Sequence, residues 1–506
     1  MERNGNSNES VKKRRLKDGE QEINQHEDIK TNLQNSKENN IKTIKSNEHS
    51  SEEEEEEDNE TQEEKIKIVK DIYLDTIDRT RLDFDFEKIC CISNSNFNIY
   101  ACLICGKFFQ GKGKSTQAYF HSIDEDHHVF INLSSLNVYI LPDDHLVEDP
   151  SLNDIKYVIK PTFTKEQVYS MVYNPMPKYS FDLNNKKYLP GYVGLNNIQQ
   201  NDYMNVILQA LIHIPPIRDY FLLNEVDNNS SQLIQKFSLL CRKIYNPQAF
   251  KGQVSPHEVL QEISYCSKKE YRIEKRKEPI KFLAWFLNQL HLDMGGSKKR
   301  KTIISNTFRG IVQNSIYALE DNLIFNLKSG ESKIQENQFF FLSIELPPPP
   351  LFQDSEEKNI IPQVSIANIL SKFDGKTEQE SSNLIKKYKI LELPPYLIVY
   401  YKRFNKNNFN FEKNPTIVTF PINQSLNLNF INNNVDKYYN LLVNVVHENS
   451  ELPENGNYLC YLKHPGLNQW FKVNDLNVDV ELSEMIPLTQ SYLQIWELKD
   501  NKYNKK

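Results

Sequence analysis

The sequence is poor in glycine, in cysteine and in long apolar runs. Its 506 residues include only 15 glycines, which excludes a collagen-like or glycine-linker protein. No run approaches the roughly twenty consecutive apolar residues that a membrane-spanning helix needs. Met1 is followed by a polar stretch without an apolar segment, so we expect no secretory signal. In such a chain, seven cysteines indicate reduced thiols and metal ligands, and we expect a cytosolic or nuclear protein.

Residues 1–65 lack aromatic side chains altogether and contain only eight apolar residues. Such a segment cannot bury enough surface to offset its ordering entropy, so we predict a disordered, charged tail. The tail holds 19 acidic and 11 basic residues, which leaves a net charge of +1 for the rest of the chain. A folded part that is nearly neutral gives no global electrostatic case for nucleic-acid binding.

Two charge runs occur within this tail. Glu52–Glu57 and Asp58 form an acidic block, which we interpret as a solvated stretch. A basic cluster fits either a nuclear import signal or another solvated stretch, and consists of Lys12, Lys13, Arg14, Arg15 and Lys17.

The remaining sequence divides into two ordered blocks of α+β type. We expect a first domain over 66–160, a polar and proline-marked linker over 161–188, a larger domain over 189–498 and a short polar tail over 499–506. The second block alternates helical and strand-like patterns, which indicates one large α+β domain with insertions. Its clearest predicted elements are a helix over Phe282–Leu292 and strands over Tyr396–Tyr401 and Tyr458–Leu462.

A metal-binding pattern lies in the first domain. Cys102 and Cys105 form a Cys-x-x-Cys pair on a predicted tight turn, where both thiolates can reach one tetrahedral ion. His121 and His127 follow at a distance that suits the same ion, and four such ligands imply zinc. In a cysteine-poor chain this set predicts one structural zinc ion.

Other interpretations of this pattern remain open. His128 competes with His127, and Cys90 and Cys91 either contribute a ligand or pack as small apolar side chains. A chance or redox-active Cys-x-x-Cys without metal is a second interpretation. A third is a finger that reads nucleic acid, but both of its histidine spacings would be shorter.

The stretch from Cys102 to Leu133 resembles the zinc finger of ubiquitin-hydrolase type. That resemblance implies a compact α/β module with zinc ligands at Cys102, Cys105, His121 and His127, and in some members the module captures the free C-terminal tail of ubiquitin. The basic residue that often follows the motif is Lys107 here, not Arg, which weakens bidentate capture of a terminal carboxylate. The finger is therefore expected to be structural or a protein-docking surface.

A second resemblance begins at Pro190. The stretch PGYVGLNNIQQNDYMN is similar to the opening box of the ubiquitin-specific proteases, a papain-like family whose pattern reads G-L-x-N-L-G-N-T-C-Y-M-N. The matching positions fix the register and place Asp202 where the nucleophilic cysteine belongs. They are Gly194, Leu195, Asn197, Tyr203, Met204 and Asn205.

Asp202 is better suited to a structural role than to catalysis. The nucleophile of this family lies at a helix N-terminus, and Asp is favoured there because its carboxylate accepts from first-turn amides. We therefore predict that Asp202 caps a helix running through Val206, Ile207 and Leu211. As a nucleophile toward an amide, a carboxylate would have to form a high-energy anhydride.

The histidine box of the same family is also altered. In the motif G-H-Y-x-x-Y the general base is replaced by Asn457, whose amide does not titrate. The orienting residue of the W-x-x-F-[DN]-D motif is retained as Asn474. His447, a strand histidine ten residues upstream, could rescue catalysis only within hydrogen-bond reach of a nucleophile. We conclude that Asp202, Asn457 and Asn474 form a degenerate triad.

Further stretches narrow the resemblance. Active members carry two Cys-x-x-Cys pairs that bind a zinc in the fingers region, but no cysteine lies between Cys266 and Cys460, so we expect that zinc to be absent. Residues 82–88, 279–291, 393–422 and 491–497 resemble a catalytically inactive, splicing-factor branch of the family. That branch implies a nuclear protein that assembles or stabilises the spliceosomal tri-snRNP.

Two classes of function follow from the motifs. The first is a non-enzymatic splicing factor that binds tri-snRNP proteins with the finger and the disarmed scaffold. The second is a residual deubiquitinase, with a ubiquitin-binding adaptor between the two. The changes at Asp202 and Asn457 favour the first, because they remove the nucleophile and the base. The sequence leaves open which snRNP protein is contacted and whether ubiquitin or RNA is bound.

Overall fold

The computed structural model describes residues 73–499, except for residue 228 and the segments 319–329, 349–360, 382–383, 407–410 and 429–436. All of these residues belong to one unit, Tyr73–Lys506. The tail predicted over 1–65, with its basic cluster and acidic block, lies outside the described residues, as do residues 500–506. In the described part, no single helix is long and apolar enough to cross a membrane. Helices α5 (Asp202–Ile212) and α6 (Pro215–Leu223) pass that test only jointly, as a pair bent by 83°.

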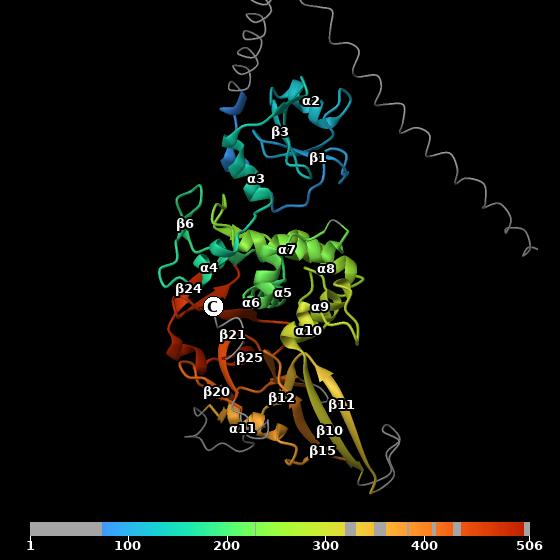
Figure 1. Ribbon diagram of the computed structural model, residues 1–506, viewed down its shortest axis with the longest axis vertical. Helices are drawn as coiled ribbons and strands as arrows, with labels where there is room; N and C mark the ends of the chain where they lie inside the picture. Colours follow the sequence, from blue (N-terminus) through green and yellow to red (C-terminus); the bar gives the residue numbers. More distant parts are fainter. Residues whose placement is uncertain are drawn as a thin grey trace, which may run out of the picture. The chain divides into compact units, whose positions relative to one another are not determined.

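An antiparallel five-stranded sheet with the order β2-β1-β3-β4-β5 forms the first domain (Figure 1). Alternate residues of β1 (Ile99–Cys102) face opposite sides of this sheet, so Ile99 and Ala101 join one apolar cluster and Tyr100 and Cys102 another. The other elements are η1 (Arg79–Arg81), β2 (Phe108–Gln110), α2 (Gln117–Asp124), β3 (Val129–Asn132), β4 (Val138–Ile140), β5 (His145–Val147), η2 (Pro150–Leu152) and α3 (Asn153–Ile159).

The stretch before β1 joins the cores of the two domains. Leu82 and Phe84 are buried in the core of the first domain, where Phe250 of the second domain packs with them. The carboxylate of Asp85 accepts a hydrogen bond from Lys243 Nζ at 2.7 Å. The domains therefore share a packed and charged junction.

The segment predicted as a linker, residues 161–188, is part of the fold instead. Helix α4 (Lys165–Tyr173) begins with a capping box in which Thr164 and Gln167 bond to each other's backbone. Val168 and Val172, one turn apart, are buried in the core of the second domain. Polar residues are mixed with the apolar and aromatic ones in this helix, and prolines lie near both of its ends, so the sequence pattern hides it. Strands β6 (Ser180–Phe181) and β7 (Lys187–Tyr188) complete the segment.

Helices gather on one side of the second domain and strands on the other (Figure 1). The predicted helix over Phe282–Leu292 is confirmed as α9 (Pro279–Asp293), which starts with proline and buries Phe282, Phe286 and Leu290 along one face. The other helices are α5 (Asp202–Ile212), α6 (Pro215–Leu223), α7 (Gln232–Ile244), α8 (His257–Cys266) and α10 (Ile303–Phe308), and the short strands β8 (Gly194–Leu195) and β9 (Gln253–Val254) lie between them in the chain.

The helices pack on an eight-stranded sheet. Seven of its strands follow the order β12-β16-β25-β21-β22-β23-β24, and the eighth, β20, pairs with β21. The strands predicted over Tyr396–Tyr401 and Tyr458–Leu462 are confirmed as β16 (Tyr396–Lys402) and β22 (Asn457–His464). In β22, Tyr458 and Cys460 face the helices, whereas Leu459 packs into a second cluster with α11 (Ile366–Leu370). The remaining strands are β12 (Leu342–Glu345), β20 (Leu426–Asn427), β21 (Tyr438–Glu448), β23 (Gln469–Asn474), β24 (Asn477–Glu481) and β25 (Ser491–Leu498).

A four-stranded sheet with the order β11-β10-β15-β14 occupies the region expected to lack the second zinc. β10 (Gly310–Ala318) starts at a glycine because a Cβ there would lie 2.4 Å from Phe339 and 2.8 Å from the carbonyl oxygen of Glu392. The remaining elements are β11 (Ser332–Phe339), β13 (Gln363–Ser365), η4 (Ser371–Phe373), β14 (Gln379–Ser381), β15 (Leu384–Glu392), β17 (Phe404–Lys406), β18 (Phe411–Lys413), β19 (Ile417–Thr419) and η5 (Ser483–Leu488).

Candidate functional site

The four predicted zinc ligands lie together in the first domain. One ligand atom from each of Cys102, Cys105, His121 and His127 falls within 4.8 Å of the other three. Cys105 Sγ is 3.4 Å from His121 Nε2, which is 3.0 Å from His127 Nδ1. Ligands that share a tetrahedral zinc are about 3.3–3.8 Å apart, given bonds of about 2.0–2.3 Å. The donor set therefore fits zinc, and the ligand atoms, two of which are closer together than they would be around the ion, converge on one point.

The local backbone explains why these side chains converge. Cys102 ends β1, and its amide donates to the carbonyl of Lys107 at 2.9 Å, which closes the turn that carries Cys105. Gly106 has a φ of 76° and a Cβ there would lie 2.3 Å from the carbonyl oxygen of Arg81, so this turn requires glycine. A hydrogen bond between the two thiols lowers the pKa of Cys105 and raises that of Cys102, so the pair shares one proton between its sulfur atoms.

The competing ligand residues lie outside this cluster. His128 uses both ring nitrogens elsewhere, on the carbonyl of Leu141 at 2.7 Å and on Asp126 at 2.9 Å. Cys90 is buried in the apolar core and accepts from the Ser93 amide at 3.4 Å. The structure therefore brings together His127, not His128, with the cysteine pair.

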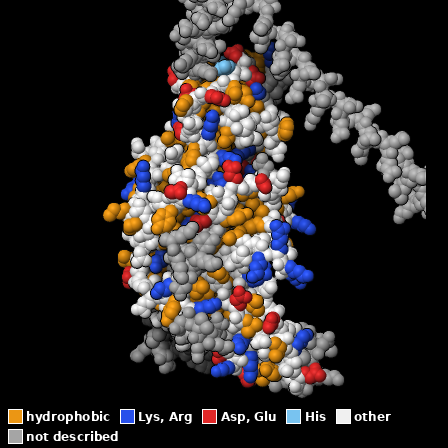
Figure 2. All heavy atoms as spheres, viewed as in Figure 1, with side chains coloured by type: hydrophobic (Ala, Val, Ile, Leu, Met, Phe, Trp, Pro, Cys, Tyr) orange, Lys and Arg blue, Asp and Glu red, His pale blue; other side chains and the backbone are white. Residues whose placement is uncertain are grey.

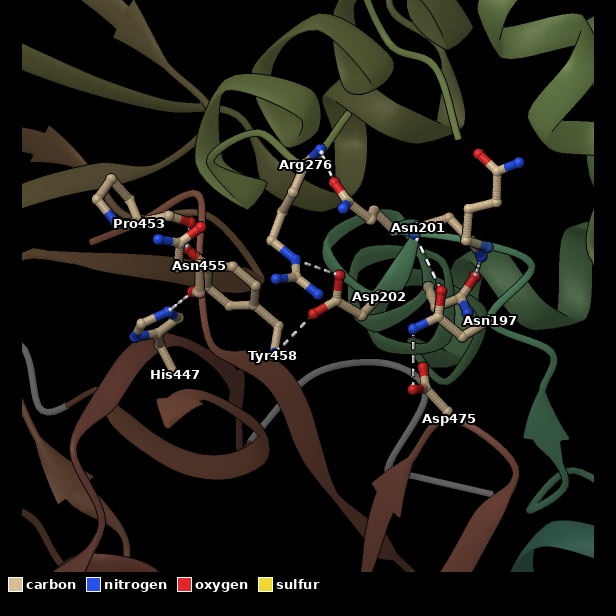
Figure 3. A network of polar contacts seen from close by, with 12 residues as sticks. Asn197, Asn201, Asp202, Arg276, His447, Pro453, Asn455, Tyr458 and Asp475 are labelled. Atoms are coloured by element: carbon tan, nitrogen blue, oxygen red, sulfur yellow. Dashed lines mark hydrogen bonds and ion pairs between the residues drawn. The ribbon is translucent and has the colours of Figure 1, made fainter. Parts of the chain in front are cut away.

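In the second domain, Asp202 is the first residue of α5, and the structure corrects its predicted role. The N-cap is Asn201, one residue earlier. The Asp202 side chain, 2% exposed, points away from the first-turn amides and accepts from Arg276 Nε at 2.7 Å and from the Tyr458 amide at 3.0 Å (Figure 3). Both carboxylate oxygens are thus engaged. Asp202 joins α5 to β22 and to the segment before α9.

A network of amides and one carboxylate positions this end of α5 (Figure 3). Asn201 Oδ1 accepts from the Ile198 amide at 2.7 Å, and its Nδ2 donates to Asn205 Oδ1 at 3.0 Å. Asn197 Nδ2 donates to Asp475 Oδ2 at 3.0 Å. Burial raises the pKa of Asp475, and the hydrogen bond from Asn197 opposes that rise. Asn197, a motif residue near the position where the family has its nucleophile, therefore holds Asp475 in the loop after β23.

The other two degenerate positions flank these contacts. Asn457 is exposed at the start of β22 and directly precedes Tyr458, whose amide bonds to Asp202. Asn474 ends β23 and directly precedes Asp475. The fold thus brings all three predicted positions to one place, where an active member would hold its triad.

His447 does not provide a base for Asp202. Its Nε2–H donates to the carbonyl of Asn455 at 2.6 Å, and its Nδ1 is buried without a partner in the described structure (Figure 3). Burial lowers the pKa of His447 to about 4, which keeps the ring neutral at pH 7. The chain beside His447 passes through Gly456, which has a φ of 75°. Glycine is required at this position because a Cβ there would lie 2.2 Å from the carbonyl oxygen of Glu448.

Arg276 is the functional residue that the sequence analysis missed. It lies in a run of charged residues, 274–278, with three basic residues between two glutamates, which carries no motif. Its side chain is 14% exposed and is paired with Asp202 across 74 residues of chain. At this place the chain offers a carboxylate, a guanidinium and carboxamides, and none of these forms a nucleophile and base pair.

The chain matches two family descriptions. Residues 193–496 match the family described as Ubiquitin carboxyl-terminal hydrolase. Residues 90–152 match the family described as Zn-finger in ubiquitin-hydrolases and other protein.

Three curated relatives span most of their own length in the comparison. The human protein named Ubiquitin carboxyl-terminal hydrolase 39 is 44% identical over 456 residues, which are 85% of this chain and 80% of that protein. The protein named Probable mRNA-splicing protein ubp10 of Schizosaccharomyces pombe is 43% identical over 451 residues, 85% of this chain and 89% of that one. Pre-mRNA-splicing factor SAD1 of Saccharomyces cerevisiae is 31% identical over 455 residues, 86% and 96% of the two chains.

A solved structure gives the same result. A chain described as an essential yeast splicing factor superimposes with a TM-score of 0.70 at 31% identity, covering 85% of this chain and 100% of that one. Together with the relatives and the two family matches, this confirms the resemblance inferred from the motifs. It also confirms the expected fold class, a small zinc-finger domain followed by a ubiquitin-specific-protease fold.

Proposed function

The chain belongs to the ubiquitin carboxyl-terminal hydrolase family, and we propose that it acts as a pre-mRNA splicing factor that performs no catalysis. One observation carries the proposal. Relatives named as splicing proteins align with 85% or more of this chain, through the finger and the protease-like domain together. The proposed role is thus that of the whole two-domain chain and not of either domain alone.

The absence of catalysis is proposed from the chemistry at Asp202. Its carboxylate is buried and bonded to Arg276 and to the Tyr458 amide, so it is neither free nor a competent nucleophile toward an amide. Asn457 offers no base in place of the family's histidine. A residual deubiquitinase, the alternative, would need another nucleophile. Cys460 is unsuitable because it is fully buried and its thiol has a pKa raised by burial.

We further propose that the first domain holds one structural zinc ion. Cys102 and Cys105 would supply thiolates, and His121 and His127 would supply neutral ring nitrogens. The bound ion would add to the folding free energy of this small domain. Lys107, which is exposed where the family often has arginine, argues against tight capture of the ubiquitin tail and for a protein-docking role.

The proposed setting is the nucleus, and the proposed partners are proteins of the spliceosomal tri-snRNP. A ubiquitin-binding adaptor is the second candidate, because the protease-like scaffold that would receive ubiquitin is retained.

Two measurements test the proposed function. Depleting the protein from its own cells should raise unspliced pre-mRNA, measured by reverse-transcription PCR across introns, and the wild-type chain should restore splicing. Affinity capture of the chain from nuclear extract, read by mass spectrometry, should recover tri-snRNP proteins above a tag-only control. Normal splicing after depletion would refute the splicing role, and capture of ubiquitin conjugates without snRNP proteins would favour the adaptor.

A further inference from the structure

Basic side chains are concentrated in one part of the second domain. Residues 267–301 carry 11 Lys and Arg against four Asp and Glu, a net charge of +7, whereas residues 66–506 together carry only +1. Figure 2 shows Lys and Arg side chains gathered over the region of α8, α9 and α10. Eight of the cations are exposed and form no ion pair with any described residue. We call them the basic surface: Lys268, Lys269, Arg272, Lys275, Lys298, Lys299, Arg300 and Lys301.

A tight turn after α8 fixes the first part of the basic surface. Lys268 and Lys269 have φ values of 53° and 65°, a left-handed conformation that glycine adopts without strain. Their amides donate to the carbonyls of Tyr265 at 3.0 Å and Ser264 at 2.7 Å. The two lysines thus hold fixed positions just beyond the end of α8, where the helix dipole also favours cations.

A second turn after α9 fixes the other part. Ser297 Oγ accepts from the amides of Lys299 at 3.3 Å and Arg300 at 3.0 Å, and the Ser297 amide donates to the Arg300 carbonyl at 3.1 Å. Helices α8 and α9 both pack against α7, so the two turns belong to the same helical layer.

An aromatic side chain stands beside the cations. Tyr265, in the last turn of α8, is 80% exposed, and its carbonyl accepts from the Lys268 amide, so the exposed ring belongs to the same turn as Lys268 and Lys269. Cations alone would suit an acidic protein, an anionic membrane or a nucleic acid. An exposed ring flanked by unpaired cations favours a nucleic acid, because bases stack on aromatic rings while ammonium groups bind phosphates.

We propose that Tyr265 and the basic surface bind single-stranded nucleic acid, with the cations on phosphates and the Tyr265 ring stacked on a base. That this nucleic acid is RNA rests on the proposed function. The binding itself does not, and it is measured on the purified chain without splicing components.

The experiment is fluorescence anisotropy of the full chain with labelled RNA oligonucleotides of about 12 nucleotides, the site size of a small binding surface. Changing Lys298, Lys299, Arg300 and Lys301 together to Ala should weaken binding at least about 10-fold at low salt. The slope of log affinity against log salt concentration should also become less steep, by roughly 0.7 for each lost phosphate contact. Tyr265→Ala should weaken binding about 5-fold or more, whereas Tyr265→Phe should bind as the wild type does.

A matched variant controls for charge. It replaces four exposed lysines outside the basic surface by Ala, and it should bind as the wild type does: Lys114, Lys333, Lys372 and Lys376. A chain lacking residues 1–65 should also bind normally, which separates the basic surface from the tail's basic cluster. Three results would overturn the proposal: no binding at low salt, an equal loss in the matched variant, or tighter binding to a duplex of the same sequence. Binding of acidic peptides without binding of RNA would instead assign the basic surface to a protein partner. DNA of the same sequence binding more tightly than RNA would overturn the RNA assignment alone.

Discussion

The ion pair between Asp202 and Arg276 leads to a quantitative prediction about stability. Asp202 is 2% exposed and its side chain accepts two hydrogen bonds, one from the guanidinium and one from the Tyr458 amide. Removing one partner of a buried ion pair costs about 3–5 kcal/mol because the other charge is left uncompensated. Since the Arg276 side chain is 14% exposed and can regain some water, we expect Asp202→Ala to cost about 3 kcal/mol, the lower end of that range.

Two further variants separate charge from shape. Asp202→Asn keeps an acceptor oxygen for one donor and should cost about half as much, roughly 1.5 kcal/mol. Arg276→Ala leaves the carboxylate, which is 2% exposed and cannot regain water, with one amide donor, so it should cost more than Asp202→Ala, about 4 kcal/mol. The double variant with Ala at both positions should be more stable than the sum of the single losses predicts, with a coupling of about 1–2 kcal/mol.

The assay is urea unfolding followed by tryptophan fluorescence. All three tryptophans, Trp285, Trp470 and Trp496, lie in the second domain, so the signal reports on the domain that holds the pair. The matched control is the exposed pair of Lys402 and Glu345, at 46% and 75% exposure, where Lys402→Ala should cost well under about 1 kcal/mol. Additive losses in the double variant, or an Asp202→Ala variant as stable as the wild type, would refute the reasoning.

Three other predictions follow from the two sites. The purified chain should hold one zinc ion by elemental analysis, and Cys102→Ala should release it and unfold the first domain; two or more tightly held ions would contradict this. The wild type should neither cleave ubiquitin amides nor react with thiol-directed ubiquitin probes. Asp202→Cys should label weakly and Asp202→Cys with Asn457→His better, each restored group being worth on the order of 10²–10⁴ in rate, and cleavage by the wild type that Asp202→Ala abolishes would contradict it. Burial lowers the pKa of His447 to about 4 in the folded chain, whereas it is near 6.5 in the unfolded chain. Between these two pH values the unfolded chain therefore binds more protons at this residue than the folded chain does. Stability should therefore fall as the pH drops from 6.5 towards 4, by up to about 1.4 kcal/mol per pH unit from this residue, and His447→Gln should flatten that slope in urea unfolding.

Local patterns predicted the long elements and the metal ligands but not the long-range pairing. Helix α9 and strands β16 and β22 have strong apolar patterns, and the spacing from Cys102 to His127 predicts the cluster that the structure brings together, although it did not decide between His127 and His128. Helix α4 was missed because its apolar and aromatic residues are mixed with polar ones in a proline-marked stretch, and only Val168 and Val172 are buried. Arg276 was missed because its partner lies 74 residues away, and an ion pair between distant segments leaves no periodic trace. The N-cap of α5 was predicted one residue late, at Asp202 and not at Asn201. Nothing in the local sequence indicates that the Asp202 carboxylate bonds to a distant arginine and not to the first-turn amides.

The carboxylate of Asp202 has a mechanical consequence. Its two bonds reach Arg276, 74 residues away, and the Tyr458 amide, 256 residues away, so one side chain fastens three distant segments together. A thiol at this position has a single sulfur and could not accept from both donors in the same way. In an enzyme the corresponding residue forms and breaks bonds with something that arrives from outside. Here the same point acts as a noncovalent crosslink within the chain, so changes at position 202 should appear as altered cooperativity of unfolding between the helices and the sheet.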